Sequence, residues 1–443
     1  MTTRTIAIVG AGCSGTLVTA QLARAAADAR TALSVLLIDA TDHGPGLAYA
    51  TEDPLHLLNV PAARLGAFDD LPDGFLAFAR SLDSAIRPED FVPRRWYGRY
   101  LRDVLDQADA RLDTVGGALE RIVGEVVAIE PVAGGECLTF DDGGTRRADL
   151  VVLASGVLPS QVDPPLDPTA PTCFASPWLP GALTPLDDAT VLLVGSGLTA
   201  VDAALTLTAG SPNVRVVAVS RSGAWPFAHR DGPLHPPVPA PDTLEAAARR
   251  GADELAEAVC AHIASVDGRG EDWRDAVDGI RPHVQRLWGA LAADQQSALL
   301  TRHVRAWERR RHRMAPAVAQ RLAELERAGR VRLLRGTVGD ALAQLRVDRV
   351  IACTGPAADI TRVADPLLQQ LFAVGRACTD EQRLGLRTDD GWLLDATGST
   401  STTLATLGPL RRGELWESTA VPEIRSQATR LADQLLQQTD SRR

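Results

Sequence analysis

The sequence lacks lysine altogether, so all 46 of its permanently basic residues are arginines. This absence excludes every chemistry that needs a lysine, such as a Schiff base, a P-loop phosphate site or a lysine general base. A GC-rich coding preference is the simplest explanation of the bias. Every cationic contact must therefore come from the planar guanidinium of arginine or from one of the eight histidines.

The chain also lacks long apolar runs and an excess of positive charge. Its longest apolar runs, such as residues 151–158, are far too short to span a bilayer. The net charge of -10 argues against general binding to nucleic acids or anionic membranes. The amino-terminal residues indicate a strand and not a signal peptide, so we expect a cytoplasmic protein without a membrane or nucleic-acid partner.

Cysteine pairs and metal-binding histidine patterns are missing as well. None of the six cysteines forms a Cys-x-x-Cys motif, and their spacing fits neither zinc nor a disulfide framework. Buried, reduced thiols are the simplest interpretation. The histidines show no His-x-x-x-His spacing, so we expect no metal. The six cysteines are Cys13, Cys137, Cys173, Cys260, Cys353 and Cys378.

What the chain does contain is one pattern used twice. Residues 5–40 and 190–223 each show a strand, a glycine turn, a helix and a second strand. Further strand-like runs follow at 148–159 and 347–356. Such alternation is typical of parallel sheets built from βαβ units. The sequence therefore predicts an α/β fold with two Rossmann-like dinucleotide-binding domains.

The remaining segments suggest how the domains are divided. Residues 243–329 have helical periodicity throughout and predict a helical insertion in the second domain. A proline-rich stretch within 160–190 predicts a crossing linker, and 419–438 a last helix. We expect an FAD-binding domain from 1–165 plus 376–443 and an NADPH-binding domain over 166–375.

The first glycine turn predicts a dinucleotide site. Gly10, Gly12 and Gly15 form a G-x-G-x-x-G motif around Ser14, directly after a strand. In such motifs the glycines allow a tight turn, a close approach to a pyrophosphate and close packing of helix on strand. Asp39 ends the next strand, where a carboxylate binds ribose hydroxyls and repels a 2′-phosphate. The site suits FAD or NAD, and its place at the amino end, together with the second motif, favours FAD.

The second glycine turn differs where the first has its acid. The next strand ends at Ser-Arg-Ser, and an arginine there can pair with the 2′-phosphate of NADPH while serine hydroxyls donate to it. A solvated surface arginine is the alternative interpretation. The residues that we assign to this site are Gly195, Gly197, Thr199, Ala200, Ser220 and Arg221. Two such sites in one chain commonly serve hydride transfer from a nicotinamide to a flavin.

Four longer stretches carry a resemblance to a known family. They are 44–68, 91–101, 305–316 and 407–425. In them the sequence resembles two-dinucleotide-domain flavoproteins that include FAD-dependent urate hydroxylases and flavin-dependent aspartate N-monooxygenases. The resemblance covers nearly the whole chain. The motif residues that match within the second and third stretches are Pro93, Arg94, Tyr97, Arg311, His312, Arg313 and Pro316.

The resemblance implies two further sets of site residues. The first would lie near the flavin: Tyr49, His56, Leu58, Asn59, Val60, Arg94, Asp395 and Gly408. The second would bind a small anionic substrate: Arg311, Arg313, Arg411 and Arg412. His56 could equally be a buried core histidine, and the arginines at 309–313 a solvated helix end beside the negative dipole.

The function that the resemblance implies is a single-component monooxygenase. NADPH would reduce FAD, and O2 would add to give a flavin C4a-(hydro)peroxide that oxidises a small polar, nitrogen-containing substrate. A non-oxygenating FAD/NADPH reductase or dehydrogenase, and an FAD-binding redox regulator, remain alternatives. The sequence decides neither the substrate nor the oligomeric state, and it names no catalytic side chain.

Overall fold

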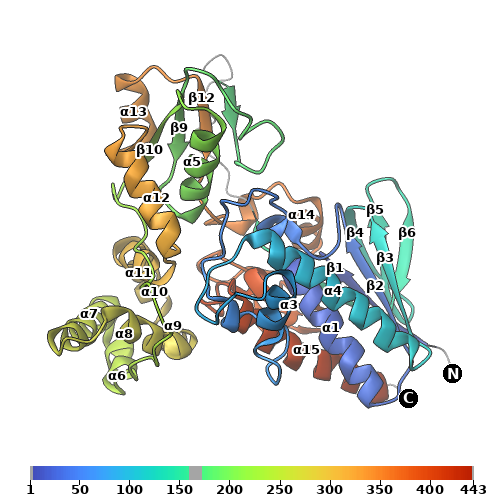
Figure 1. The fold of residues 1–443 in the computed structure, drawn as a ribbon. Helices are drawn as coiled ribbons and strands as arrows, with labels where there is room; N and C mark the ends of the chain where they lie inside the picture. The colour runs from blue at the N-terminus through green and yellow to red at the C-terminus, as the bar shows by residue number, and fades with distance from the viewer. Residues whose placement is uncertain (1–2, 159–171, 442–443) are drawn as a thin grey trace. The chain divides into compact units, whose positions relative to one another are not determined.

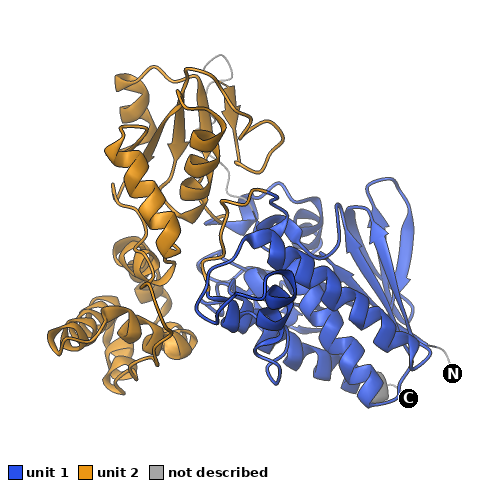
Figure 2. Ribbon diagram, viewed as in Figure 1, with its two compact units in different colours: residues 1–52, 61–158, 358–443 blue, residues 53–60, 159–357 orange. Residues whose placement is uncertain are grey.

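The computed structural model describes residues 3–158 and 172–441, which form two compact units (Figures 1 and 2). Unit 1 comprises residues 1–52, 61–158 and 358–443, and unit 2 comprises 53–60 and 159–357. The part of the predicted linker from 159 to 171 lies outside the described residues. The assignment of one cofactor to each unit stays a prediction.

Unit 1 is built on a seven-stranded sheet in the order β13-β14-β15-β7-β1-β2-β3. The strands β15, β7, β1, β2 and β3 run parallel, and β13 and β14 add an antiparallel edge. A separate antiparallel sheet joins β4, β5 and β6. The strands are β1 (Arg4–Val9), β2 (Leu33–Asp39), β3 (Ala118–Val123), β4 (Val126–Val132), β5 (Gly135–Phe140), β6 (Thr145–Ala148), β7 (Leu150–Leu153), β13 (Thr388–Asp389), β14 (Trp392–Leu394) and β15 (Thr400–Thr406).

Two long helices of unit 1, α4 and α15, pack against helix α1. In Figure 1, α1 lies between α4 and α15, and both helices contact it. The centre of the sheet is apolar, as in Ile6 to Ile8 of β1, which are fully buried. The helices are α1 (Cys13–Asp28), α2 (Gly46–Tyr49), η1 (Ala62–Arg64), α3 (Gly74–Leu82), α4 (Arg94–Asp113), η3 (Ile360–Arg362), α14 (Pro366–Ala373), η4 (Gly408–Arg411) and α15 (Val421–Ser441).

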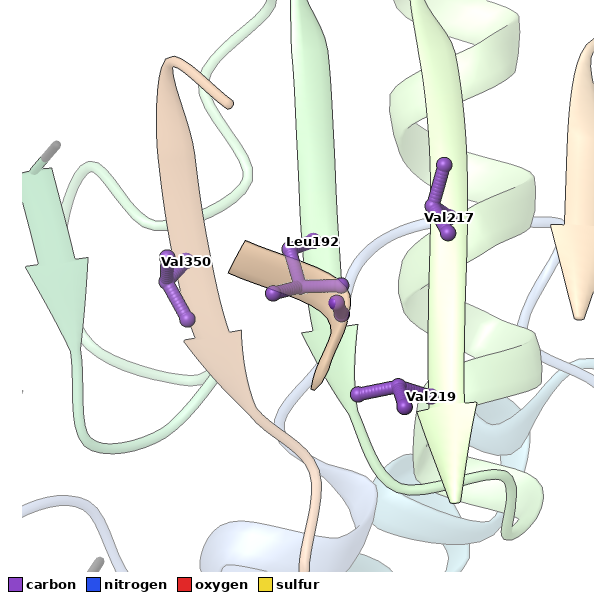
Figure 3. Close-up of a cluster of buried hydrophobic side chains, with 5 residues drawn as sticks. Leu192, Val217, Val219 and Val350 are labelled. Atoms are coloured by element: carbon purple, nitrogen blue, oxygen red, sulfur yellow. The ribbon is translucent and has the colours of Figure 1, made fainter. Parts of the chain in front are cut away.

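Unit 2 is built on a five-stranded parallel sheet in the order β11-β10-β9-β12-β8. Figure 3 shows its buried side chains Leu192, Val217, Val219 and Val350, which pack with Ala341 of α13. Val217 and Val219 share one face because side chains alternate along a strand. The strands are β8 (Thr172–Phe174), β9 (Thr190–Val194), β10 (Arg215–Ser220), β11 (Val331–Arg335) and β12 (Arg349–Ala352).

Helices fill the chain between β10 and β11, as the sequence predicts. The last of them, α12, returns to the sheet and contacts α5 and β11. The helices of unit 2 are α5 (Leu198–Gly210), α6 (Thr243–Arg250), α7 (Ala252–Gly268), α8 (Trp273–Ile280), η2 (Arg281–His283), α9 (Val284–Ala290), α10 (Ala293–Arg302), α11 (Val304–Arg311), α12 (Pro316–Arg327) and α13 (Val338–Gln344). Two parallel-sheet units with a helical insertion confirm the predicted fold class.

Across the described ranges, no helix combines the length and the apolar character needed to cross a membrane.

Candidate functional site

The first glycine turn joins β1 to α1 at the carboxyl edge of the unit 1 sheet. Gly10 has a φ of +105°, which favours glycine, and its N–H donates to the Ile38 carbonyl over 2.7 Å. A Cβ on Gly15 would lie 1.9 Å from the Gly10 carbonyl oxygen, so the helix can pack on the turn only without a side chain. Gly12 is the N-cap of α1 and offers no capping side chain. The turn therefore leaves the first N–H groups of α1 to an anionic ligand.

Asp39 lies beside this turn and is held by it. Its Oδ2 accepts a hydrogen bond from the Ala11 N–H over 2.7 Å, and its Oδ1 accepts from the N–H and hydroxyl of Thr41. A carboxylate has about four acceptor positions, so these three bonds leave one for a ribose hydroxyl. The fixed carboxylate fits the predicted role at the ribose of FAD.

A second glycine from the other end of the chain reaches the same edge. Gly408 follows β15, which runs parallel to β7 and β1 and so ends at the same edge of the sheet as β1, with β7 between them. A Cβ on Gly408 would lie 2.5 Å from the hydroxyl of Ser14, which is itself buried. The N–H of Gly408 donates to Oε1 of Gln427 over 2.9 Å. Unit 1 thus brings Ser14 and Gly408 together, and α15 fixes the turn through Gln427.

All three tyrosines of the chain form one aromatic cluster in unit 1. The rings of Tyr49 and Tyr97 lie 4.7 Å apart, and Tyr97 and Tyr100 lie 5.7 Å apart. Tyr97 is fully buried beside the Cys13 thiol, and its hydroxyl has no well-formed hydrogen bond. Burial raises the pKa of Cys13 to about 12, so this thiol stays protonated. Arg94 begins α4 and acts electrostatically on Tyr49, so the structure brings these two predicted residues together.

The segment from His56 to Val60 belongs to unit 2, although the sequence places it in the first domain (Figure 2). Nε2 of His56 lies 2.8 Å from the hydroxyl of Thr206 in α5, and that hydroxyl also donates to Asp53. Nε2 of His229 lies 3.0 Å from the Asn59 carbonyl. His56 is buried, as the alternative of a core histidine expected. Leu58 is buried as well, and the segment is anchored to unit 2 at both ends.

Asp395 does not lie at the edge that holds the glycine turn. It follows β14, and its Oδ1 accepts from the N–H groups of Thr397 and Ser399 before β15 begins. The hydroxyl of Thr397 donates to it and, with these N–H groups, lowers the pKa of Asp395. Gly408 lies after the opposite end of β15, which at about 3.3 Å per residue is roughly 20 Å away. Asp395 closes a hairpin, so the structure gives it a turn-forming role and separates it from the other predicted flavin residues.

The second glycine turn repeats the first in unit 2. Gly195 has a φ of +121°, and its N–H donates to the Val219 carbonyl over 2.9 Å. Gly197 is the N-cap of α5, which begins just before Thr199, and a Cβ on Gly197 would meet no atom within 4 Å. Ala200 takes the place that Gly15 has in the first turn and is fully buried. The space above Gly197 suits the close approach of a pyrophosphate.

The residues after β10 differ from those after β2. The Ser220 hydroxyl accepts from the Ser196 hydroxyl over 2.8 Å and from the Gly223 N–H over 3.1 Å. Arg221 is exposed and forms no ion pair within the described ranges. No carboxylate occupies the position that corresponds to Asp39. This arrangement offers an exposed positive charge and a fixed hydroxyl where unit 1 offers a fixed acid.

The four arginines predicted to bind substrate are divided between the units. Arg313 is fully buried and pairs with Asp278 of the helical insertion, and burial lowers its pKa. Arg411 is buried and donates to both carboxylate oxygens of Glu414, over 2.8 and 3.2 Å. Both guanidinium groups are therefore committed to acids of their own unit. Arg311 is buried at the end of α11, and the guanidinium of Arg412 lies 4.9 Å from the centre of the Trp416 ring.

Sequence patterns missed several residues that shape these sites. Gly46 comes within 3.3 Å of the position that a Cβ on Gly12 would take, so α2 closes over the first turn. Thr206 and His229 anchor the 53–60 segment, and Gln427 holds Gly408. Of these contacts, only that of Gly46 has a local signal, because the sequence Gly-Pro-Gly at 44–46 is typical of a turn. The other contacts join residues more than 18 positions apart, which local patterns do not reveal.

Comparisons with known proteins agree with this architecture. Residues 7–158 match the model of a family described as FAD-NAD(P)-binding. No curated protein matches the chain. Ornithine hydroxylase (PvdA) from Pseudomonas aeruginosa, in its reduced form, is 15% identical, with a TM-score of 0.60 over 99% of this chain and 100% of that one.

Two further solved structures have related folds. The ornithine N-hydroxylase KtzI from Kutzneria sp. 744, solved with reduced FAD, NADP+ and L-ornithine, is 13% identical, with a TM-score of 0.60 and coverage of 99% and 100%. OTEMO, solved with FAD and NADP, is 15% identical, with a TM-score of 0.53 and coverage of 99% and 86%. At such low identity these likenesses concern the fold. The chain has the fold of two-domain flavoproteins, and residues 7–158 match the FAD-NAD(P)-binding family model.

Proposed function

We propose that the protein is an FAD-dependent, NADPH-consuming monooxygenase that acts on a small polar, nitrogen-containing substrate. The observation that carries this proposal is the pair of glycine turns. Each turn follows the central strand of a parallel sheet, but a fixed acid accompanies the first and an exposed arginine the second. That pairing fits two different dinucleotides, and hydride transfer between them is their common use.

FAD fits the first turn for three reasons. The N-terminus of α1 faces the turn without a capping side chain, Asp39 keeps a free acceptor position, and Gly12 and Gly46 carry no side chains in the approach. Ser14 and Gly408 would line the same edge. Bound FAD would supply the redox chemistry and the reaction with O2, which no side chain of the chain can perform.

NADPH fits the second turn. Gly197 leaves room for the pyrophosphate, and the fixed Ser220 hydroxyl and the guanidinium of Arg221 lie where a 2′-phosphate would bind. The absence of an acid after β10 removes the repulsion that would favour NADH. The protein's own contribution is to bind and orient this coenzyme.

The substrate assignment has narrower support. It rests on the resemblance to urate hydroxylases and aspartate N-monooxygenases and on the fold shared with the ornithine hydroxylases. Arg313 and Arg411 are paired with acids of their own units, so an anionic group of the substrate would have to compete with Asp278 and Glu414 for these two guanidinium groups.

Disulfide reduction, one possible activity of a non-oxygenating FAD/NADPH reductase, is not favoured by the cysteines. The six cysteines, all within the described ranges, form no disulfide, and burial raises the pKa values of Cys13 and Cys353 far above neutrality. A dithiol mechanism needs an accessible thiolate beside a second thiol. The thiols of Cys13 and Cys353 offer neither.

The test is to measure NADPH oxidation by the purified yellow protein in air, with candidate amino acids and purines. We expect one substrate to accelerate NADPH consumption and to yield a product that is heavier by one oxygen atom. Labelled O2 must supply that oxygen. If NADPH reduces the flavin but no candidate class gains oxygen, and a quinone or protein acceptor is reduced instead, the monooxygenase proposal is wrong.

A further inference from the structure

A second arginine stands beside Arg221 at the carboxyl edge of the unit 2 sheet. In the parallel pairing of β10 with β11, Arg335 is in register with Ser220. The next N–H along, that of Gly336, donates to the Ser220 carbonyl over 3.0 Å. The two strands therefore end together: β11 ends at Arg335, and Arg221 directly follows the end of β10.

The turn after β10 packs directly on Arg335. Gly223 has a φ of +58°, and a Cβ there would lie only 2.6 Å from the Cβ of Arg335. The chain from Ser220 to Gly223 thus folds over the first carbons of the Arg335 side chain. This contact holds the first carbons of Arg335 against the turn, in a strand whose register pairs Arg335 with Ser220.

Within the described ranges, Arg221 and Arg335 differ from other arginines of unit 2 because their guanidinium groups form no ion pair or hydrogen bond. Both side chains are exposed. Arg330 donates to the Thr208 carbonyl and Arg309 to the Trp225 carbonyl. The acid that follows β11, Asp340, accepts from both the N–H and the hydroxyl of Thr337 in a capping box.

We propose that Arg335 is a second binding residue for the 2′-phosphate of NADPH and shares it with Arg221 and the serine hydroxyls. The inference rests on the proposed NADPH site. A 2′-phosphate carries up to two negative charges at neutral pH, and one guanidinium does not neutralise it. Two neighbouring arginines repel each other in the free protein, and the dianion removes that repulsion when it binds. Arg335 is then a determinant of coenzyme choice that the Rossmann motif does not reveal.

The experiment compares Arg335→Gln with the control Arg332→Gln, which removes an exposed arginine three residues earlier in the same strand. Two measurements are made on the full-length protein. One is flavin reduction by NADPH and by NADH in a stopped-flow instrument. The other is calorimetric binding of adenosine 2′,5′-bisphosphate and of 5′-AMP, which requires no turnover.

We expect Arg335→Gln to weaken NADPH and the bisphosphate by about tenfold or more, the usual effect of losing a charged hydrogen bond. NADH and 5′-AMP should change far less, and Arg332→Gln should resemble the wild type. Arg335→Lys, which keeps the charge but loses the planar fork, should lie between the two.

Other outcomes separate the two proposals. If the wild type prefers NADPH and the bisphosphate but Arg335→Gln binds them as well as Arg332→Gln does, the role of Arg335 is wrong and the proposed function stands. Equal loss for phosphorylated and unphosphorylated ligands would assign Arg335 to the fold and overturn its role. If the wild type binds the bisphosphate no better than 5′-AMP, the NADPH assignment fails together with it.

Discussion

The two glycine turns of this protein share a backbone and differ in what surrounds it. In unit 1, Asp39 is tied to the turn by a 2.7 Å bond, and α2 closes over Gly12. In unit 2, Gly197 faces open space and Arg221 is exposed. A closed site suits a resident cofactor such as FAD, and an open site with an exposed cation suits a coenzyme that binds and leaves. The residues around each glycine motif, and not the motif itself, therefore distinguish the proposed FAD site from the proposed NADPH site.

The largest effect should come from adding a methyl group to the closed turn. Gly15→Ala would push a Cβ to 1.9 Å from the Gly10 carbonyl, which the backbone must relieve by moving. We expect a loss of about 3 kcal/mol in unfolding free energy and loss of bound flavin. The matched variant in the open turn, Ala200→Gly, should cost only about 1 kcal/mol through helix propensity. Thermal unfolding and flavin absorbance measure both, and equal losses would refute the difference.

The second effect concerns Asp39. Asp39→Ala removes the acceptor for Ala11 and Thr41 as well as the proposed ribose contact. FAD affinity should fall by about 1.5–3 kcal/mol, and titration of the apoprotein with FAD measures it. Binding of adenosine 2′,5′-bisphosphate to the second unit should not change. A parallel loss at both sites would contradict the assignment of one dinucleotide to each turn.

The third effect is a dependence of the free energy of unfolding on pH, which arises from His229 in unit 2. Burial, with the nearby Arg313, lowers the pKa of His229 from 6.5 to about 3. The unfolded chain takes up a proton below pH 6.5 while the native ring stays neutral, so stability falls as pH drops through that window. At pH 5 this linkage costs about 2 kcal/mol.

His229→Gln tests that linkage, because glutamine keeps a donor for the Asn59 carbonyl but does not titrate. The variant should have a flatter dependence of unfolding free energy on pH between 6.5 and 5, measured by urea denaturation. Burial also lowers the pKa of His262, on α7 of the same unit, but this side chain is less buried than His229. His262→Gln should therefore flatten the curve less. An unchanged slope in His229→Gln would show that His229 is already accessible to protons.

The smallest effect should be that of Asp395→Ala. Its carboxylate serves Thr397 and Ser399 in a hairpin turn, so we expect unchanged FAD affinity by the same titration. A loss as large as that of Asp39→Ala would restore Asp395 to the flavin site and contradict its position at the far end of β15.

Local patterns predicted the parts of this fold that depend on neighbours in sequence. The turns at Gly10 and Gly195 could be found because they need positive φ values, which favour glycine, and glycine can be recognised in the sequence. The helical insertion could be found because its periodicity persists over many residues. The role of Asp395 could not be decided from its surroundings, because an acid-containing turn before a strand has the same composition whether it binds a ligand or its own backbone.

Long-range packing lay beyond those patterns. Nothing near His56 indicates that its partner is Thr206, 150 residues away, and nothing near Arg313 indicates that Asp278, 35 residues away, pairs with its guanidinium. The register that sets Arg335 beside Ser220 depends on how β10 and β11 align. Such pairings arise only when the chain folds, and they decide which of the many arginines remain available.

The most direct test of the central claim is anaerobic reduction of the bound flavin in the wild type and in Arg221→Ala. We expect the wild-type protein to be yellow, to contain FAD and to be reduced much faster by NADPH than by NADH at equal concentration. Arg221→Ala should weaken NADPH by about 1–3 kcal/mol and leave NADH nearly unchanged. A protein that binds no FAD, or one whose variant loses both coenzymes equally, would contradict the claim that these two turns hold two different dinucleotides.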